Sequence, residues 1–344
     1  MSENNAKNNL LVQVNDLKMH FPIRKGLLQR TVNTVKAVDG VSFAVEEGKT
    51  FGLVGESGCG KTTTGRCILR MYTPTEGQIL YRGRDITNLT PKQIAPFRHE
   101  IQIIFQDPYS SLDPRQTIGS IVLEAITASG RKDIARADRN KAVDELLTLV
   151  GLDPTIRTRF PHELSGGQRQ RVGIARALAC DPKLLICDEP VSALDVSIQA
   201  QVINLLEELQ RKLGLTYIFI AHDLAVVRHI SDTIGVMYLG KLVEVTKSEE
   251  LYDNPLHPYT KALLSAIPIA DYEVEQRRER IVMENEIPSP INPPSGCPFH
   301  PRCRYATEEC KRGMPELRQY TPGHYVACHN LSSVTGEPIG EAGE

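Results

Sequence analysis

Residues 55–63 read GESGCGKTT and directly follow the apolar run FGLV at residues 51–54. This stretch fits the pattern G-x-x-x-x-G-K-[ST] and predicts a strand, a glycine-rich loop and the start of a helix. Backbone N–H groups of such a loop can wrap a phosphate, and the helix N-terminus adds positive potential. A surface lysine on a plain glycine-rich turn is the alternative, which the flanking strand and helix disfavour.

The loop predicts contacts to a nucleotide and to a magnesium ion. We expect Lys61 to reach the β- and γ-phosphates and the Thr62 hydroxyl to bind Mg²⁺. The predicted nucleotide-binding residues of the loop are Gly55, Ser57, Gly58, Cys59, Gly60, Lys61, Thr62 and Thr63.

An acidic pair ends another apolar run, KLLICDEP at residues 183–190. Alone, such a pair is more often a helix cap and a solvated carboxylate. After a buried strand, in a chain that already holds a phosphate loop, Asp188 is the expected Mg²⁺ contact. Glu189 is then the candidate general base that activates the attacking water.

A second glycine-rich stretch, LSGGQRQR at residues 164–171, predicts a helix start. Ser165 and Gln168 have the S-x-x-Q spacing of a capping box. Gly166 and Gly167 fall in the first turn, although glycine is a poor helix former. Bare backbone N–H groups at a helix N-terminus suit the close approach of an anion.

The rest of the pattern predicts a layered α/β fold. Short apolar runs at residues 101–106, 183–189 and 215–221 are typical of strands buried on both faces. An apolar stripe predicts an amphipathic helix over 196–214. Strands that alternate with helices indicate a largely parallel sheet. Residues 107–180 are expected to form a helical insertion, and residues 24–36 a basic, polar loop.

Composition excludes some classes of protein. The 344 residues are 41% hydrophobic and 24% charged, with a formal net charge of −2. The chain is therefore not strongly basic, and its net charge gives no indication of nucleic-acid binding. The chain contains no run of 18 apolar residues, so the sequence predicts no membrane-spanning helix. The polar start MSENNAKNNL lacks the apolar region of a secretion signal. We therefore expect a soluble, cytoplasmic chain whose membrane role, if it has one, comes through a partner.

At this point the motifs resemble one family. The phosphate loop, LSGGQ, the acidic pair, SALD at residues 192–195 and His222 occur in the order and spacing of an ATP-binding cassette (ABC) ATPase. The resemblance covers residues 10–245. It implies a phosphate-loop ATPase with an antiparallel β subdomain, a helical insertion subdomain and, here, a small C-terminal cysteine-rich extension.

The resemblance also implies a head-to-tail dimer in which each ATP is bound by both subunits. Ser165, Gly166, Gly167 and Gln168 are then expected to contact the γ-phosphate of the ATP held by the partner. Two bound ATPs hold the dimer closed, and hydrolysis lets it open.

Four further residues take roles from the resemblance. Gln106 resembles the glutamine that senses Mg²⁺ and the attacking water, and His222 the histidine that contacts the γ-phosphate. Asp195 resembles an aspartate that contacts the other subunit. Phe21 is the candidate for stacking on adenine, with a packed core role as the alternative.

Other segments resemble the oligopeptide/dipeptide/nickel importer branch of this family. They are QDPYSSLDPRQTIG at 106–119, NPLHPYTKALLSAIP at 254–268 and NPPSGCPFHPRC at 292–303. The resemblance implies a bacterial di- or oligopeptide importer, with 106–119 docking two permease subunits. The chain itself would lie at the cytoplasmic face of the inner membrane.

The same branch implies a second, different ATPase subunit and, indirectly, an extracytoplasmic peptide-binding protein. The cargo stays open, because it never touches this subunit. A soluble cassette protein of translation or DNA repair is the alternative. Such proteins usually carry two cassettes or an inserted module, and this chain shows neither.

Four cysteines crowd the C-terminus: Cys297, Cys303, Cys310 and Cys328. In a reducing compartment such a cluster suggests a metal more than disulfides. The spacing C-x5-C-x6-C-x17-C fits neither a zinc knuckle nor a ferredoxin loop. This arrangement resembles the one with which the importer branch holds a [4Fe–4S] cluster on four thiolates. Zinc, with His300, His324 and His329 nearby in sequence, is one alternative, and no metal is another.

The chain is therefore expected to divide into four parts. They are an ATPase domain at 1–245, a helical linker at 246–290, a cysteine-rich extension at 291–330 and a disordered tail at 331–344.

Overall fold

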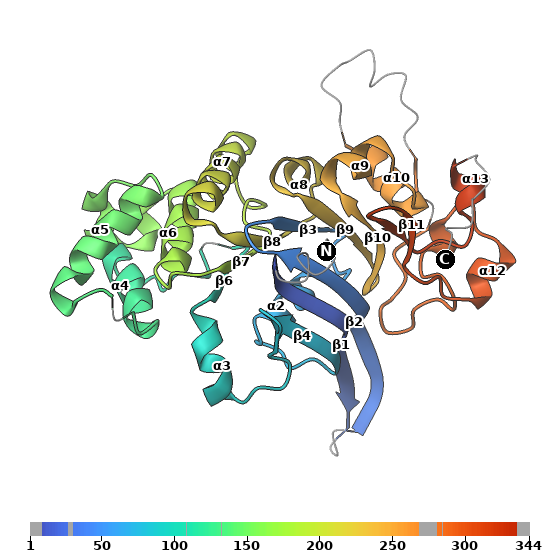
Figure 1. The fold of residues 1–344 in the computed structure, drawn as a ribbon, viewed down its shortest axis with the longest axis horizontal. Helices are drawn as coiled ribbons and strands as arrows, with labels where there is room; N and C mark the ends of the chain where they lie inside the picture. The colour runs from blue at the N-terminus through green and yellow to red at the C-terminus, as the bar shows by residue number, and fades with distance from the viewer. Residues whose placement is uncertain are drawn as a thin grey trace, which may run out of the picture.

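The computed structural model describes residues 9–26, 30–107, 109–131, 133–267, 281–283 and 285–335 (Figure 1). Two sheets form its centre, with strand orders β2-β1-β4-β5 and β11-β12-β10-β9-β3-β8-β7-β6. Helices and a smaller antiparallel sheet cover the larger sheet on its two faces (Figure 1). No helix of the described residues is long and apolar enough to cross a membrane.

The larger sheet has the predicted parallel centre. Its strands are β3 (Thr50–Val54), β6 (Ile101–Ile104), β7 (Leu184–Asp188), β8 (Thr216–Ala221), β9 (Thr233–Tyr238), β10 (Lys241–Lys247), β11 (Arg318–Thr321) and β12 (His324–Val326). Strands β6, β7, β8, β3 and β9 run parallel to one another, and β10, β12 and β11 are antiparallel additions at one edge. Sequence reasoning did not single out β9.

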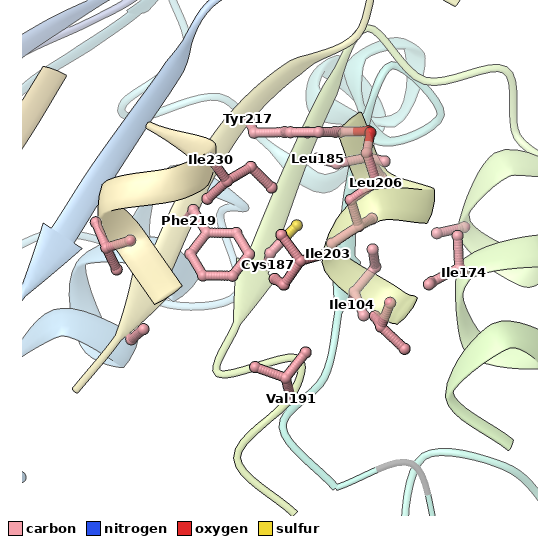
Figure 2. Close-up of a cluster of buried hydrophobic side chains, with 14 of the residues drawn as sticks. Ile104, Ile174, Leu185, Cys187, Val191, Ile203, Leu206, Tyr217, Phe219 and Ile230 are labelled. Carbon is pink, nitrogen blue, oxygen red and sulfur yellow. The ribbon is translucent and has the colours of Figure 1, made fainter. Parts of the chain in front are cut away.

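Apolar side chains of the central strands point alternately to the two faces of the sheet, so both faces are buried. On β7, Leu185 and Cys187 belong to one hydrophobic cluster, whereas Leu184 and Ile186 belong to the other. Successive side chains of a strand point to opposite faces, so a continuous apolar run serves two cores at once. Figure 2 shows the first cluster, in which Leu185 and Cys187 lie near side chains of β8 and the helices around it.

The helices of this part include the one predicted over 196–214. They are α2 (Lys61–Ile68), α3 (Pro91–Arg98), α4 (Ile118–Ala128), η2 (Arg136–Asp138), α5 (Arg139–Leu149), η3 (Pro154–Thr158), η4 (Pro161–Glu163), α6 (Gly166–Leu178), α7 (Val196–Leu213) and α8 (Leu224–Ile230). Each described element between residues 107 and 180 is helical, as expected. These elements gather at one end of the large sheet (Figure 1).

The smaller sheet corrects one prediction. It consists of β1 (Leu10–Lys25), β2 (Arg30–Glu46), β4 (Glu76–Tyr81) and β5 (Arg84–Asp85). Residues 24–25 and 30–36 of the predicted polar loop instead belong to β1 and β2, which pair with Ile23 opposite Asn33 and Lys25 opposite Arg30. Both strands are exposed in this part, so no apolar alternation marks them in the sequence.

The C-terminal part adds α9 (Ser248–Asp253), α10 (Pro258–Ser265), η5 (His300–Arg302), α12 (Glu308–Arg312) and α13 (Leu331–Thr335). Strand β12 pairs with β10, with Glu244 opposite Val326, so this segment extends the large sheet. The disorder predicted from residue 331 is wrong at its start, because Leu331 opens α13 and is buried with Leu256 and Val326. Residues 336–344 lie outside the described residues.

Candidate nucleotide-binding and hydrolysis site

The phosphate loop joins the carboxyl end of β3 to the start of α2. Gly55 and Gly60 have φ angles of 152° and 106°, which favour glycine. A Cβ at Gly55 would lie 2.1 Å from the carbonyl oxygen of Met237, and one at Gly60 would lie 2.0 Å from that of Ala37. The loop therefore needs these glycines because neighbouring backbone approaches it on two sides.

Lys61 begins α2 and is only 4% exposed. Its Nζ donates hydrogen bonds to the carbonyl oxygens of Gly55 (2.7 Å) and Glu56 (3.0 Å). The ammonium group is thus fixed at the loop, where a phosphate can exchange for these carbonyl groups.

Thr62 and Asp188 meet across the site. The Thr62 hydroxyl donates to Asp188 Oδ1 at 2.7 Å, and Asp188 is only 3% exposed. Burial raises the pKa of Asp188, against the lowering effect of the Thr62 hydrogen bond. A hydroxyl and a buried carboxylate are oxygen ligands that suit Mg²⁺, so the donor set fits the predicted ion.

Glu189 is the point where three loops converge. Its Oε2 accepts a hydrogen bond from Gln106 Nε2 at 2.8 Å and lies 3.2 Å from His222 Nδ1. These residues follow β6, β7 and β8, which are neighbours in the sheet, so their carboxyl ends bring the side chains together. Glu189 has a φ angle of 46°, and a non-glycine residue in this region is strained.

A cavity of about 390 Å³ joins these features. Its lining residues are Ala37, Ser57, Gly58, Gly60, Lys61, Thr62, Thr63, Gln106, Glu189 and His222. All except Ala37 are among the predicted site residues. Ala37 comes from β2, and a single alanine in a strand gives no sequence signal for a site.

The helix start at Ser165 forms the predicted capping box. Its Oγ accepts from the Gln168 N–H at 3.3 Å, and Gln168 Oε1 accepts from the Ser165 N–H at 3.0 Å. A Cβ on Gly167 would lie 2.6 Å from Ile198 Cγ2, so this glycine also allows α6 to approach α7. A Cβ on Gly166 would meet only Leu194 Cδ2, at 3.4 Å. The described residues that line the cavity do not include 165–168.

Two of the predicted site residues, Asp195 and Phe21, are not among the residues that line this cavity in the described part of the chain. Asp195 is exposed at the N-cap position of α7 and makes no side-chain capping bond there. Phe21 is half-buried and meets the edge of Tyr72, with ring centroids 5.4 Å apart. Phe21 is not among the described residues that line the cavity, and its contact agrees with the packing alternative.

All eight cysteines, each among the described residues, are free thiols. Burial, together with neighbouring cysteine thiols, raises the pKa of Cys297 to about 11 and that of Cys328 to about 12. The Cys297 N–H donates to the Cys310 carbonyl at 2.8 Å. Within the described residues, however, no three His, Cys, Asp or Glu side chains have the arrangement of a metal site. The predicted iron–sulfur cluster is therefore not confirmed.

Comparison with known proteins agrees with the geometry. Residues 38–192 match the family described as ABC transporter, and residues 243–310 match the C-terminal region of oligopeptide/dipeptide transporters. The chain is 57% identical over 328 residues to the oligopeptide transport ATP-binding protein AppF of Bacillus subtilis, covering 95% of this chain and 99% of that protein. It is 51% identical to OppF of Salmonella typhimurium, covering 93% and 96%.

A solved structure extends the comparison to the fold. A dimeric post-hydrolysis state of the cassette MJ0796 with ADP and Pi has a TM-score of 0.61 and 28% identity, and the match covers 69% of this chain and 98% of that one. The phosphate loop, the Glu189 constellation and the near full-length relatives lead to one conclusion: this chain belongs to the ABC-type ATPases that form the ATP-binding subunits of oligopeptide and dipeptide transporters.

Proposed function

We propose that this chain hydrolyses ATP at a site shared with a second cassette and so powers peptide import through separate membrane subunits. One observation carries the proposal: Gln106 and His222 both reach Oε2 of Glu189, at 2.8 and 3.2 Å, beside the cavity of the phosphate loop. A carboxylate positioned from both sides next to a phosphate site is the arrangement that proton removal from an attacking water needs.

The chemistry divides among the residues of this cavity. Lys61 and the loop N–H groups bind the β- and γ-phosphates, Glu189 accepts the proton of the attacking water, and His222 contacts the γ-phosphate. Thr62 and Asp188, together with Gln106, would hold Mg²⁺, which would neutralise charge on the phosphate oxygens.

The second half of each site comes from a partner cassette. Ser165 and Gly166 are exposed, lie outside the cavity of their own chain and begin a helix. A helix N-terminus with N–H groups open to solvent is suited to bind the γ-phosphate held by another subunit. The exposed Asp195 is placed to meet that subunit as well. Closure then depends on contacts that exist only while the γ-phosphate is present.

Glu189→Gln tests the hydrolytic step. The amide cannot accept the proton, so we expect hydrolysis to slow by about 10²–10⁴-fold while ATP binding persists. Closed dimers should accumulate with ATP, as measured by light scattering. Glu249→Gln, at an exposed position in α9, is the matched control and should hydrolyse normally. Normal turnover in Glu189→Gln, or full activity of a strictly monomeric preparation, would contradict the proposal.

The membrane partners form a further part of the proposal. We expect two permease subunits to contact residues 106–119, a second and different ATPase subunit to complete the dimer, and an extracytoplasmic peptide-binding protein to deliver cargo. The chain then lies at the cytoplasmic face of the inner membrane. Tyr109 in this segment is 58% exposed, and Arg169 lies over its ring at 5.0 Å, which suits a docking surface.

Affinity purification of the tagged chain from membranes tests these partners. Co-purified permeases and a second cassette protein support the importer. Ribosomes or DNA in their place would favour the soluble alternative. Loss of the permeases from a Tyr109→Ala preparation, with ATP binding intact, would assign the docking role to this segment.

The cysteine-rich region carries a separate proposal of a [4Fe–4S] cluster, with zinc as the alternative. Its support is that the thiols of Cys297, Cys303 and Cys310 all act electrostatically on that of Cys328. The Asn330 N–H also donates to Cys328 Sγ at 3.4 Å. Protein purified without oxygen and analysed for iron, sulfide and zinc decides the matter. A colourless, iron-free product excludes the iron–sulfur cluster.

A further inference from the structure

Arg302 of the C-terminal region reaches the phosphate loop. Its side chain is 6% exposed and binds Glu56 with two hydrogen bonds, Nη1 to Oε2 at 2.7 Å and Nη2 to Oε1 at 3.1 Å. Glu56 is the second residue of the GESGCGKTT loop. The two residues are 246 positions apart in the chain, so only the fold brings them together.

The backbone of Glu56 is held as firmly as its side chain. Its N–H donates to the hydroxyl of Tyr259 at 2.9 Å, and its carbonyl oxygen accepts from Lys61 Nζ at 3.0 Å. Tyr259 is fully buried on α10. Arg302 and Tyr259, both from the C-terminal part, thus fix Glu56 in the loop. The carbonyl oxygen of Glu56 in turn positions the phosphate-binding lysine.

Aromatic packing holds the arginine in place. The Arg302 guanidinium carbon lies 5.9 Å from the ring centre of Tyr238, and Nη1 lies 3.5 Å from its hydroxyl. The rings of Tyr238, Tyr259 and Phe299 pack against one another at centroid distances of 4.7 to 5.3 Å. The guanidinium therefore sits in a rigid, largely dry setting, in which a two-point contact to a carboxylate is well defined.

Charge gives this contact a consequence for nucleotide binding. Without Arg302, the Glu56 carboxylate beside the phosphate loop would repel a triphosphate. The Glu56 side chain is 21% exposed, so water screens its charge only in part. We propose that Arg302 is a positioning residue for ATP, acting through Glu56. It neutralises this carboxylate and, with Tyr259, fixes the loop in its phosphate-binding shape. The inference rests on the proposed phosphate site.

A double-mutant cycle on the full-length chain tests the inference. Arg302→Met removes the charge at similar volume and should raise the Kd for ATP about tenfold, the scale of one charge interaction in a protein cleft. Glu56→Gln removes the repulsion and leaves Arg302 cationic, so ATP should bind at least as tightly as to the wild type. In Arg302→Met/Glu56→Gln the affinity should return to within about threefold of the wild type.

The opposite signs of the two single variants separate charge positioning from plain structural support. If Glu56→Gln weakens binding as Arg302→Met does, or the double variant is no better than Arg302→Met, the inference is wrong. Arg304→Met, an exposed arginine two residues away, is the matched control. Should Arg302→Met fail to fold by circular dichroism, the sign of the change in Glu56→Gln alone decides.

Lys61→Ala distinguishes a failure of this inference from a failure of the site. Normal ATP binding by Lys61→Ala would refute the phosphate site itself. Lost binding in Lys61→Ala, with unchanged binding in Arg302→Met, would refute only the role of Arg302.

Discussion

At the scale of single residues, the burial of Asp188 suits the binding of a cation but lowers the stability of the fold when the carboxylate is charged. It is 3% exposed, and burial raises its pKa above the ordinary value for aspartate. A carboxyl group with a raised pKa in the folded state stabilises the fold fully only below its ordinary pKa. That contribution is lost as the pH rises through the folded-state pKa. The ionised form of Asp188 therefore stabilises the fold less than the protonated form does, until a cation neutralises it.

Asp188→Asn should consequently stabilise the protein while it destroys activity. The amide still accepts from the Thr62 hydroxyl but carries no charge, so without Mg²⁺ and ATP the melting temperature at pH 7.5 should rise. The gain should shrink as the pH falls toward the ordinary pKa of aspartate, because the wild-type carboxyl is then protonated as well. ATP hydrolysis should drop by about 10²-fold or more. Scanning calorimetry across this pH range is the check, with exposed Asp181→Asn as control, and a lower melting temperature at pH 7.5 would refute the argument.

At the scale of elements, the start of α6 combines two tasks in one residue. Ser165 caps the helix through Gln168, which is a local requirement of any helix N-terminus. The same residue is proposed to meet a phosphate held by the partner. Stability and activity can therefore be separated by a substitution that satisfies the cap but repels an anion.

Ser165→Asp is that substitution, because aspartate caps as well as serine and its charge suits a helix N-terminus. We expect the free energy of unfolding to stay the same, while ATP-driven dimerisation and hydrolysis are lost through repulsion of the γ-phosphate. Ser165→Ala should lower the free energy of unfolding by about 1 kcal/mol and affect hydrolysis less. Urea unfolding and steady-state ATPase rates measure both effects. Full ATPase activity of Ser165→Asp would show that no phosphate approaches this helix.

How far the sequence predicts these elements depends on whether their cause is local. Helix α7 and strand β7 follow from apolar spacing alone, and Glu189 follows from its place after a buried strand. The ends of β1 and β2, at residues 24–25 and 30–36, are hard to predict because their residues are mostly polar, as in a loop. Strand β9, by contrast, has a local cause in the apolar run TIGVMY.

The site divides in the same way. Residues that bind phosphate follow from motif spacing, because a loop and its helix are contiguous in the chain. The Arg302–Glu56 contact and the hydrogen bond from Tyr259 have no such local cause. They depend on how the sheet places distant segments, which no pattern in the sequence reports.

At the scale of the whole molecule, the large sheet connects the C-terminal part to the nucleotide site. Strand β12 joins the sheet through β10, and β9 lies between β10 and β3, the strand that leads into the phosphate loop. Glu244 of β10 is fully buried, and its carboxylate accepts from the N–H groups of Leu256 (2.8 Å) and His257 (3.0 Å). Its Oε1 also lies 2.7 Å from Nε2 of His324 on β12. One carboxylate thus ties β10 to β12 and to the start of α10.

Removing this carboxylate should loosen the C-terminal part and weaken ATP binding together. Glu244→Ala leaves buried N–H groups and His324 without their acceptor, so we expect the free energy of unfolding to fall by about 3 kcal/mol. The Kd for ATP should rise as well, since α10 carries Tyr259, which holds the phosphate loop. Glu250→Ala is the matched control. Its carboxylate lies 3.8 Å from Nδ1 of the same histidine but is 45% exposed, and its loss should cost less than about 1 kcal/mol. Equal losses of stability in the two variants, or unchanged ATP affinity in a destabilised Glu244→Ala, would show that the sheet does not couple the C-terminal part to the nucleotide site.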